Sequence, residues 1–350
     1  MSDLHVVILA AGKGTRMKSA LAKVLHRAGE LSLIERVLRT ADALEPSTIV
    51  IVVGHQAEDV QRALGARPGL RFARQEPQLG TGHALQQAES LVAGARGTVI
   101  LLSGDVPLLG SDTLRRLLDH HLSRRAAATV LTAVVDEPRG YGRIVRDGSL
   151  VGAIVEEKDA SADERLIREI NSGIYAFDLG PLFGALKSLG SNNAQREYYL
   201  PDLVRIYRTR GLVVEAVTLE DPREILGVNS RRELADVSAI LKSNRNEELM
   251  AAGVTIVDPA STWIGPDVTV GADTVLHPNV FLEGKTTIGS GCVIHACVRL
   301  VNTTVEDRAV INNFCVITDS HVGAGAQLGP FAHLRPQSRV ETDAKVGNFV

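Results

Sequence analysis

The first 228 residues alternate short aliphatic runs with segments in which apolar residues recur at helical spacing. The aliphatic runs predict buried strands at residues 6–9, 48–53 and 98–102. The amphipathic segments predict helices at residues 31–44, 58–64, 82–92 and 111–122. Continuous β-branched runs between helices are typical of a Rossmann-like, mainly parallel sheet covered on both faces. Ligands bind such sheets beyond the carboxyl ends of the strands, so we expect a site in the loops after Leu9, Val53 and Leu102.

A different pattern follows. Residues 230–250 predict one long helix, with Gly253 as a plausible stop. From Ile264 to Val346, fifteen aliphatic residues then recur every six positions, with two five-residue steps, and each has a small residue two positions earlier. This repeat predicts a parallel β-helix with the aliphatic residue inside and the small residue at a tight corner. Cys292 and Cys315 occupy the small position, so we expect them to be structural.

These two patterns divide the chain into three parts. We predict a first domain at residues 1–229, a connecting helix at 230–252 and a β-helix at 253–350. The repeat continues to Val350 with no polar capping segment, and stacked repeats need capped ends. We therefore expect a C-terminally shortened form of a longer protein.

Composition narrows the class of protein. The net charge of −3 supplies no basic field for nucleic acid, and no run of about 18 apolar residues predicts a membrane span. Three cysteines do not make a disulfide framework, so we expect a cytoplasmic protein. The ten histidines form no metal-ligand spacing, and His120 and His121, on a predicted helix, are expected to be solvated.

The loop after the first strand carries the first chemical signal. Residues 12–16 read Gly-Lys-Gly-Thr-Arg, and glycines let backbone N–H groups approach phosphate oxygens closely. The loop matches neither the dinucleotide fingerprint nor the Walker pattern. Lys13, Arg16 and Lys23 form a local cluster of cations in an acidic protein, which predicts a site for a polyphosphate. Lys13 fits a phosphate contact and a solvated charge equally well.

These residues also carry a resemblance to a known family. Residues 9–17 followed by Lys-Val-Leu at 23–25 resemble the signature of sugar-1-phosphate nucleotidyltransferases. Further segments resemble the bacterial bifunctional N-acetylglucosamine-1-phosphate uridylyltransferase/glucosamine-1-phosphate acetyltransferase family, namely 78–84, 104–107, 140–144, 155–159, 169–173 and 227–229. The resemblance covers the whole chain and implies a nucleotidyltransferase domain followed by a left-handed β-helix.

The resemblance implies an enzyme, a UDP-N-acetylglucosamine pyrophosphorylase. It would use UTP and N-acetylglucosamine 1-phosphate and release UDP-N-acetylglucosamine and pyrophosphate. A sugar phosphate is already an oxyanion, so the reaction needs alignment and charge neutralisation rather than a general base. In the family pattern Arg16 and Lys23 supply the cations, and Asp105 and Asn229 bind Mg²⁺.

The same resemblance implies the binding residues. The nucleotide would be held by Leu9, Ala10, Ala11, Gly12, Lys23, Gln75, Gly80 and Thr81, with Gln75 at the base. The sugar would be held by Gly142, Glu156, Asn171 and Asn229. Glu156 and Glu157 are adjacent, and alternation would turn only one of them toward the site.

Two residues depart from the family pattern, and we expect both changes to alter the affinity for substrate more than the activity. Ala22 stands where proline usually precedes the lysine, and Ser103 stands where an aromatic residue is common. Of the family's acetyltransferase site, only Arg335 falls within these 350 residues, so we expect no acetyl transfer from acetyl-CoA.

The β-helix is expected to form a homotrimer, as left-handed β-helices of this kind typically do. Two other readings stay open. One is a sugar-1-phosphate nucleotidyltransferase that uses dTTP or ATP, and the other is a non-catalytic scaffold with this fold.

Overall fold

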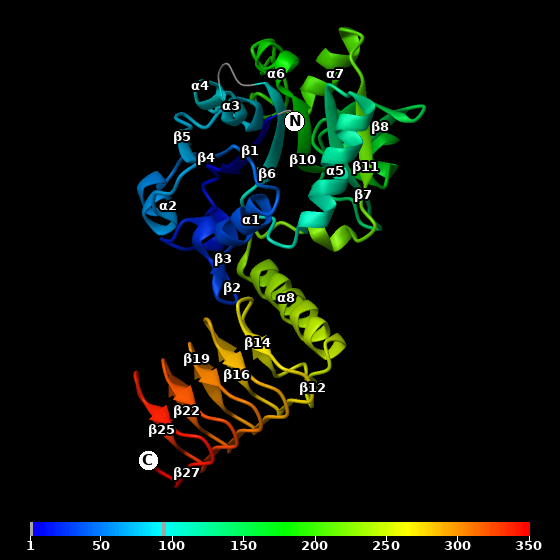
Figure 1. Ribbon diagram of the computed structural model, residues 1–350. Coiled ribbons are helices and arrows are strands. Elements are labelled where there is room, and N and C mark those ends of the chain that lie inside the picture. The colour runs from blue at the N-terminus through cyan, green and yellow to red at the C-terminus, as the bar shows by residue number, and fades with distance from the viewer. Residues whose placement is uncertain (1–2, 93–95) are drawn as a thin grey trace. The chain divides into compact units, whose positions relative to one another are not determined.

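The computed structural model describes residues 3–92 and 96–350. The chain forms two compact units (Figure 1). The first contains most of the residues up to Leu234, and the second contains Arg27–Glu30 together with Ala235–Val350. None of the helices in the described part of the chain is both long and apolar enough to span a lipid bilayer.

A nine-stranded sheet organises the first unit, and its main path runs β11-β7-β10-β6-β1-β4-β5. These strands are β1 (Asp3–Ala10), β4 (Thr48–Val53), β5 (Leu70–Arg74), β6 (Gly97–Ser103), β7 (Ala128–Val134), β10 (Glu169–Asp178) and β11 (Val214–Thr218). A hairpin of β8 (Arg143–Asp147) and β9 (Leu150–Val155) joins the sheet at β10. On the main path only β10 runs antiparallel to its neighbours, β6 and β7. The predicted mixed, mainly parallel Rossmann-like sheet is confirmed.

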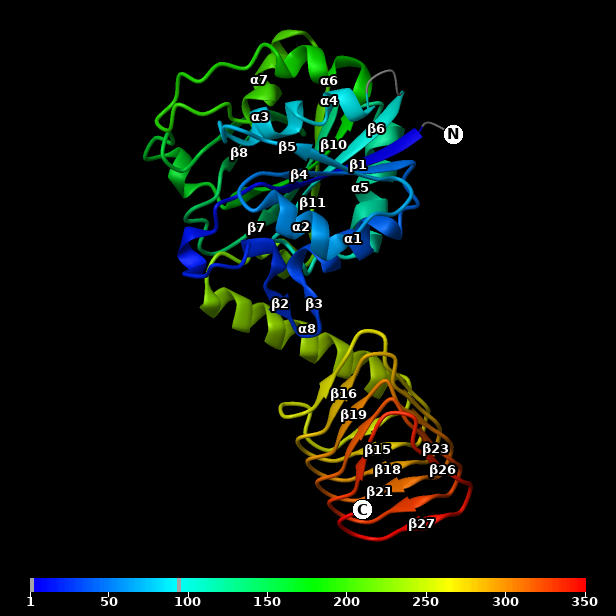
Figure 2. The same ribbon diagram turned by 90° about the vertical axis from the view of Figure 1, so that its left-hand side faces the viewer.

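Helices cover both faces of this sheet (Figure 2). Apolar residues of α1 (Leu33–Asp42), α2 (Ala57–Leu64) and α5 (Ser111–Arg124) pack on one face. Those of α3 (Thr81–Gln86), α4 (Glu89–Val92), α6 (Leu179–Leu186) and α7 (Asp202–Thr209) pack on the other. Strand β1 shows why both faces are apolar: Val6 and Ile8 belong to one core and Val7 to the other, all fully buried.

Three local predictions are wrong. The helix predicted from residue 31 begins at Leu33, because residues 31–32 form β3 (Leu31–Ser32), paired with β2 (Arg27–Ala28), and Ser32 caps the helix in a capping box with Glu35. The helix predicted at 82–92 is divided into α3 and α4, because the backbone N–H groups at 87 and 88 bond to carbonyls three residues back.

The third error concerns a histidine. His121 is buried on the inner face of α5, where Nδ1 lies 3.0 Å from Oγ1 of Thr129. Burial lowers the pKa of His121 to about 4. His120 stays half-exposed, close to Glu215.

The second unit joins α8 (Arg231–Ala251), as the long-helix prediction required, to a three-faced parallel β-helix. The first face contains β12 (Thr255–Ile256), β15 (Val275–Leu276), β18 (Val293–Ile294), β21 (Val310–Ile311), β24 (Gln327–Leu328) and β27 (Lys345–Val346). The second contains β13 (Trp263–Ile264), β16 (Phe281–Glu283), β19 (Arg299–Val301), β22 (Val316–Thr318) and β25 (His333–Leu334). The third contains β14 (Thr269–Val270), β17 (Thr287–Ile288), β20 (Thr304–Val305), β23 (His321–Val322) and β26 (Arg339–Val340). The stacked parallel strands are consistent with the predicted left-handed β-helix.

Corners of the β-helix explain the repeat. The residue immediately before a small residue often has a left-handed backbone, as at Asp273, Asn279, Cys297 and Phe314. The small residue that follows is buried. The thiols of Cys292 and Cys315 donate to the carbonyl oxygens at positions 306 and 329, at 3.2 and 3.1 Å, so their predicted structural role is confirmed.

Candidate active site

The loop after β1 brings its second glycine against Lys23. Gly14 has a φ of +61°, and a Cβ at this position would lie 2.6 Å from Cβ of Lys23. Glycine is therefore needed both for the backbone conformation and for the close approach. Lys13 and Arg16, in contrast, are exposed, and no ion pair is formed by either among the described residues. The loop thus places one of its three predicted cations, Lys23, in a defined position.

Lys23 lies between two oxygens that come from distant parts of the chain. Its Nζ donates to Oδ1 of Asn229 at 2.7 Å and forms an ion pair with Oδ2 of Asp105. Two hydrogen bonds hold these two residues in place: the N–H of Val228 donates to the carbonyl oxygen of Asp105 at 2.9 Å, and the N–H of Asn229 donates to Oε2 of Glu233 at 2.6 Å. The predicted cation and the two predicted metal ligands therefore meet at one point.

A cavity of about 440 Å³ opens beside this point at the carboxyl ends of β1 and β6. It is lined by every predicted nucleotide-binding residue, namely Leu9, Ala10, Ala11, Gly12, Lys23, Gln75, Gly80 and Thr81. Asp105, Lys13 and Ser103 also line it, whereas Arg16 and Asn229 do not.

Two polar lining residues were missed from the sequence, Gln78 and Glu197. Gln78 donates from Nε2 to the carbonyl oxygen of Ala11, which ties the glycine-rich loop to the cavity wall. It lies inside the 78–84 motif, so the motif itself could have found it. Glu197 enters from a loop with no periodic pattern, and only the tertiary structure brings it to the cavity.

Another part of the cavity wall is built around Gln75 and Thr81. Gln75 is only 5% exposed and donates from Nε2 to the carbonyl oxygen of Gly80 at 2.9 Å. Gly80 has a φ of +105°, and a Cβ there would lie 2.8 Å from the carbonyl oxygen of Tyr198. The hydroxyl of Thr81 accepts from the N–H of Leu200 at 3.1 Å. These contacts leave little freedom in this wall.

Three of the predicted sugar-binding residues lie together. A Cβ on Gly142 would be 3.4 Å from Oε1 of Glu156 and 3.5 Å from Cβ of Asn171. The N–H of Asn171 donates to the carbonyl oxygen of Gly142 at 2.9 Å. The side-chain oxygen of Asn171 accepts from the N–H of Gly173 and the hydroxyl of Tyr175, at 3.0 and 2.9 Å. Asn229 stands apart from this group, at the Lys23 contact.

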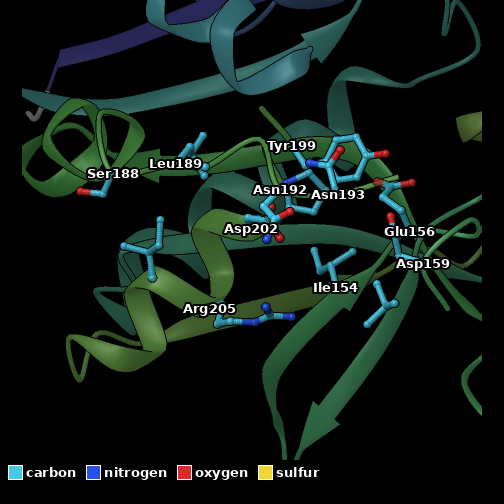
Figure 3. A pocket seen from close by; sticks show the side chains of 14 residues that line it. Ile154, Glu156, Asp159, Ser188, Leu189, Asn192, Asn193, Tyr199, Asp202 and Arg205 are labelled. Atoms are coloured by element: carbon cyan, nitrogen blue, oxygen red, sulfur yellow. The ribbon is translucent and has the colours of Figure 1, made fainter. Parts of the chain in front are cut away.

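Glu156 and Glu157 point in different directions, as predicted, but both lie beyond the end of β9, so the turn there and not strand alternation separates them. Glu157 forms an ion pair with the buried Arg143 at 2.6 Å. Glu156 lines a second cavity of about 350 Å³ together with Asp159 and Asp202 (Figure 3). Burial raises the pKa of Glu156, and the two aspartates raise it further.

The donor set at Lys23 fits a hard divalent cation. Carboxylate and amide oxygens are the ligands that Mg²⁺ prefers, and here both already face one positive charge, the ammonium of Lys23. Within residues 3–92 and 96–350, no cluster of three or more His, Cys, Asp or Glu side chains could hold a metal alone. A cation at Asp105 and Asn229 would therefore complete its coordination with phosphate and water oxygens.

Comparison with known proteins agrees with this geometry. Residues 6–171 match the family described as "MobA-like NTP transferase domain", and residues 259–350 match "GMPPB C-terminal domain". A putative glucose-1-phosphate thymidylyltransferase from Bacillus anthracis has a similar fold, with a TM-score of 0.56 at 21% identity over 68% of this chain and 94% of that one. The fold and the matched family thus define a nucleotidyltransferase, an enzyme that acts on a nucleoside triphosphate.

Closer relatives give the family. "Bifunctional protein GlmU" of an Exiguobacterium species is 51% identical over 99% of this chain and 77% of its own length. The protein of the same name from Listeria monocytogenes is 44% identical over 100% of this chain and 76% of its own length. The chain belongs to the GlmU family and spans about three-quarters of the length of these relatives. Nucleotidyltransferases of this family generally use a divalent metal ion. Arg335 is exposed after β25, and its part in acetyl transfer stays a prediction.

Proposed function

We propose that the chain transfers the uridylyl group of UTP to N-acetylglucosamine 1-phosphate. A phosphate oxygen of the sugar phosphate attacks the α-phosphorus of UTP, the bond to the β-phosphate oxygen breaks, and pyrophosphate leaves with the electron pair. The observation that carries the proposal is the convergence of Lys23, Asp105 and Asn229 beside the cavity behind the glycine-rich loop. The site offers charge and alignment, which are what phosphoryl-type transfer requires.

Mg²⁺ is the proposed metal, held by Asp105 and Asn229. When bound, it would neutralise charge on the triphosphate and on the departing pyrophosphate. Lys23 would turn from these two ligands to the phosphates when the metal ion and the nucleotide bind. Arg16 is exposed on the same loop, and we propose that it turns toward the phosphates when the nucleotide binds.

Base and sugar are proposed to bind at separate subsites. Uracil would lie against Gln75, Gly80 and Thr81, where backbone groups and one amide can match its imide edge. The N-acetylglucosamine moiety would lie against Gly142, with hydrogen bonds from its hydroxyls to Glu156 and Asn171. The contacts among these last three residues support a single sugar subsite.

Pyrophosphate release tests the assignment. The purified chain would be assayed with UTP, dTTP and ATP against N-acetylglucosamine 1-phosphate and glucose 1-phosphate, with and without Mg²⁺. We expect the highest kcat/KM for UTP with N-acetylglucosamine 1-phosphate. A preference for dTTP or ATP would overturn the assignment of UTP as the donor, and no turnover of any pair would favour a non-catalytic scaffold.

Asp105→Ala supplies the matched variant for the metal. This variant should abolish Mg²⁺-dependent pyrophosphate release while its circular dichroism spectrum stays that of the parent. Unchanged activity would remove Asp105 from the metal site.

We also propose that the β-helix associates as a homotrimer. One of its corners carries a ladder of exposed, stacked rings, with centroids of Phe314 and Phe331 5.0 Å apart and those of Phe331 and Phe349 5.1 Å apart. A ladder of exposed aromatic rings of this kind is typical of an interface. Light scattering after size exclusion should give three times the monomer mass, and Phe331→Ser should lower it, whereas Val257→Ser, also at an exposed apolar side chain, should not.

A further inference from the structure

The amide of Gln75 is held at its nitrogen by two neighbours. Nε2 donates to the carbonyl oxygen of Gly80 at 2.9 Å and lies 3.3 Å from Nδ1 of His83. A carbonyl oxygen can only accept, so the amide atom facing Gly80 must be the NH₂ group. The carbonyl oxygen Oε1 of Gln75 is then the part of the amide that can face the cavity.

The imidazole of His83 decides whether this orientation is favourable. An amide NH₂ group has two hydrogens, and Gly80 accepts one of them. The second points to Nδ1 of His83, which accepts it only when the ring is neutral and its proton is on Nε2. Burial lowers the pKa of His83, which favours the neutral ring. His83 does not line the cavity, so it acts through Gln75.

A second amide competes for the same ring. Nε2 of Gln87 lies 3.1 Å from Nε2 of His83 and 3.1 Å from the carbonyl oxygen of His83. A neutral imidazole has one acceptor nitrogen and cannot accept from both amides. The carbonyl oxygens of Gly80 and His83 hold both amides with the NH₂ group toward the ring, but Gln75 is buried, whereas Gln87 is half-exposed and can exchange its two contacts for water. The competition is resolved in favour of Gln75.

We infer that His83 is a positioning residue that sets base specificity by holding the oxygen of Gln75 toward the nucleobase. The inference rests on the proposed function, in which Gln75 contacts the base. Uracil presents an imide N–H, which donates to an oxygen acceptor. Cytosine presents a bare ring nitrogen at the same position, which repels one. Without His83 the Gly80 carbonyl alone holds the amide, so the turned amide, which offers its NH₂ group to cytosine, becomes less unfavourable.

Two substitutions separate this role from packing. His83→Phe keeps the ring volume beside Tyr198, whose ring centroid is 6.4 Å away, but removes the acceptor. His83→Asn loses the ring and keeps an acceptor. The kcat/KM of each variant would be measured with UTP and with CTP, and the KM for N-acetylglucosamine 1-phosphate would be followed as an internal control.

His83→Phe should lower the UTP-to-CTP ratio of kcat/KM about tenfold, the loss expected when one fixed hydrogen bond is removed. His83→Asn should retain most of the ratio, and the sugar-phosphate KM should stay near that of the parent in both. The reverse order, with Phe tolerated and Asn not, would overturn the inference and assign His83 a packing role.

Gln75→Leu distinguishes failure of this inference from failure of the proposed function. If Gln75→Leu relaxes base choice and His83→Phe does not, the inference fails while the proposed function stands. If the parent enzyme does not prefer UTP to CTP, the proposed base site fails and the inference fails with it.

Discussion

Replacing Lys23 by glutamine should make the nucleotide-free protein bind a divalent cation more tightly. The ammonium of Lys23 already takes the oxygens of Asp105 and Asn229 that a metal ion would need. Two positive charges cannot share these oxygens, so the lysine must leave before a metal ion binds there. Nucleotide phosphates would give Lys23 a new partner, and nucleotide and metal ion would therefore assist each other's binding.

The size of the effect follows from the contacts that must be broken. A hydrogen bond to a charged group contributes about 1.5–3 kcal/mol. The side chains of Lys23 and Asp105 are 13% and 23% exposed, and the ammonium regains water when it leaves, which offsets part of the loss, so we take the low end of that range. Removal of the lysine should therefore tighten metal binding about tenfold, because 1.4 kcal/mol is a factor of about ten.

Electron paramagnetic resonance of Mn²⁺ measures the free ion directly, without nucleotide and without turnover. Titrations of the parent and of Lys23→Gln would be compared with Lys18→Gln, which removes the same charge from an exposed position of the same segment. An affinity of Lys23→Gln equal to or below that of the parent would refute the competition. An equal gain in Lys18→Gln would show that net charge, rather than the contact, is responsible.

Three further outcomes follow from the structure. Gly14→Ala should raise the KM for UTP, because the new Cβ displaces Lys23. Gly148→Ala, at the same φ of +61° but with open space around its Cβ, should only lower the free energy of unfolding by roughly 1–2 kcal/mol through left-handed strain. Steady-state kinetics and denaturant melts of both variants check this, and equal KM values would contradict it. Glu156→Gln should be more stable than the parent at neutral pH, because the raised pKa of Glu156 makes its ionisation unfavourable in the folded state; thermal melts should show the gain vanish below the ordinary pKa of 4.5. Stability of the parent should fall as pH drops from 6.5 toward 4, where the unfolded chain protonates His121 and the folded chain does not; denaturant titrations should show a weaker fall for His121→Phe, and an identical slope would rule out this contribution.

The fold could be predicted because both units follow a simple period. Continuous β-branched runs such as residues 48–53 have no polar face, which favours a central parallel strand. The six-residue repeat maps directly onto three faces per coil. Errors arose where tertiary contacts decide the outcome: His121 looks like a surface residue in a polar segment, but its place on α5 turns it inward.

The candidate-site residues that lie within family motifs could be predicted from the sequence. Asp105 and Asn229 are far apart in sequence, so their spacing does not predict that they lie together. The family pattern predicted it. The positions of Arg16 and Glu197 could not be predicted. Arg16 lies on an exposed turn whose side chain no packing fixes, and Glu197 enters the cavity through a loop whose path depends on the fold of its neighbours.

The stacking of coils in the β-helix determines how far the effect of a destabilising substitution extends along it. Each coil exchanges backbone hydrogen bonds with the coil before and the coil after it, as when Val275 donates to Cys292 and Val293 donates to Ala309. Order is therefore passed from neighbour to neighbour, as in a one-dimensional chain of linked units. A cavity made at Ile294 should shorten the exchange lifetimes of amide hydrogens in its own coil most and in the adjoining coils less. The effect should fade over a few turns, which gives the β-helix a correlation length that hydrogen exchange can measure.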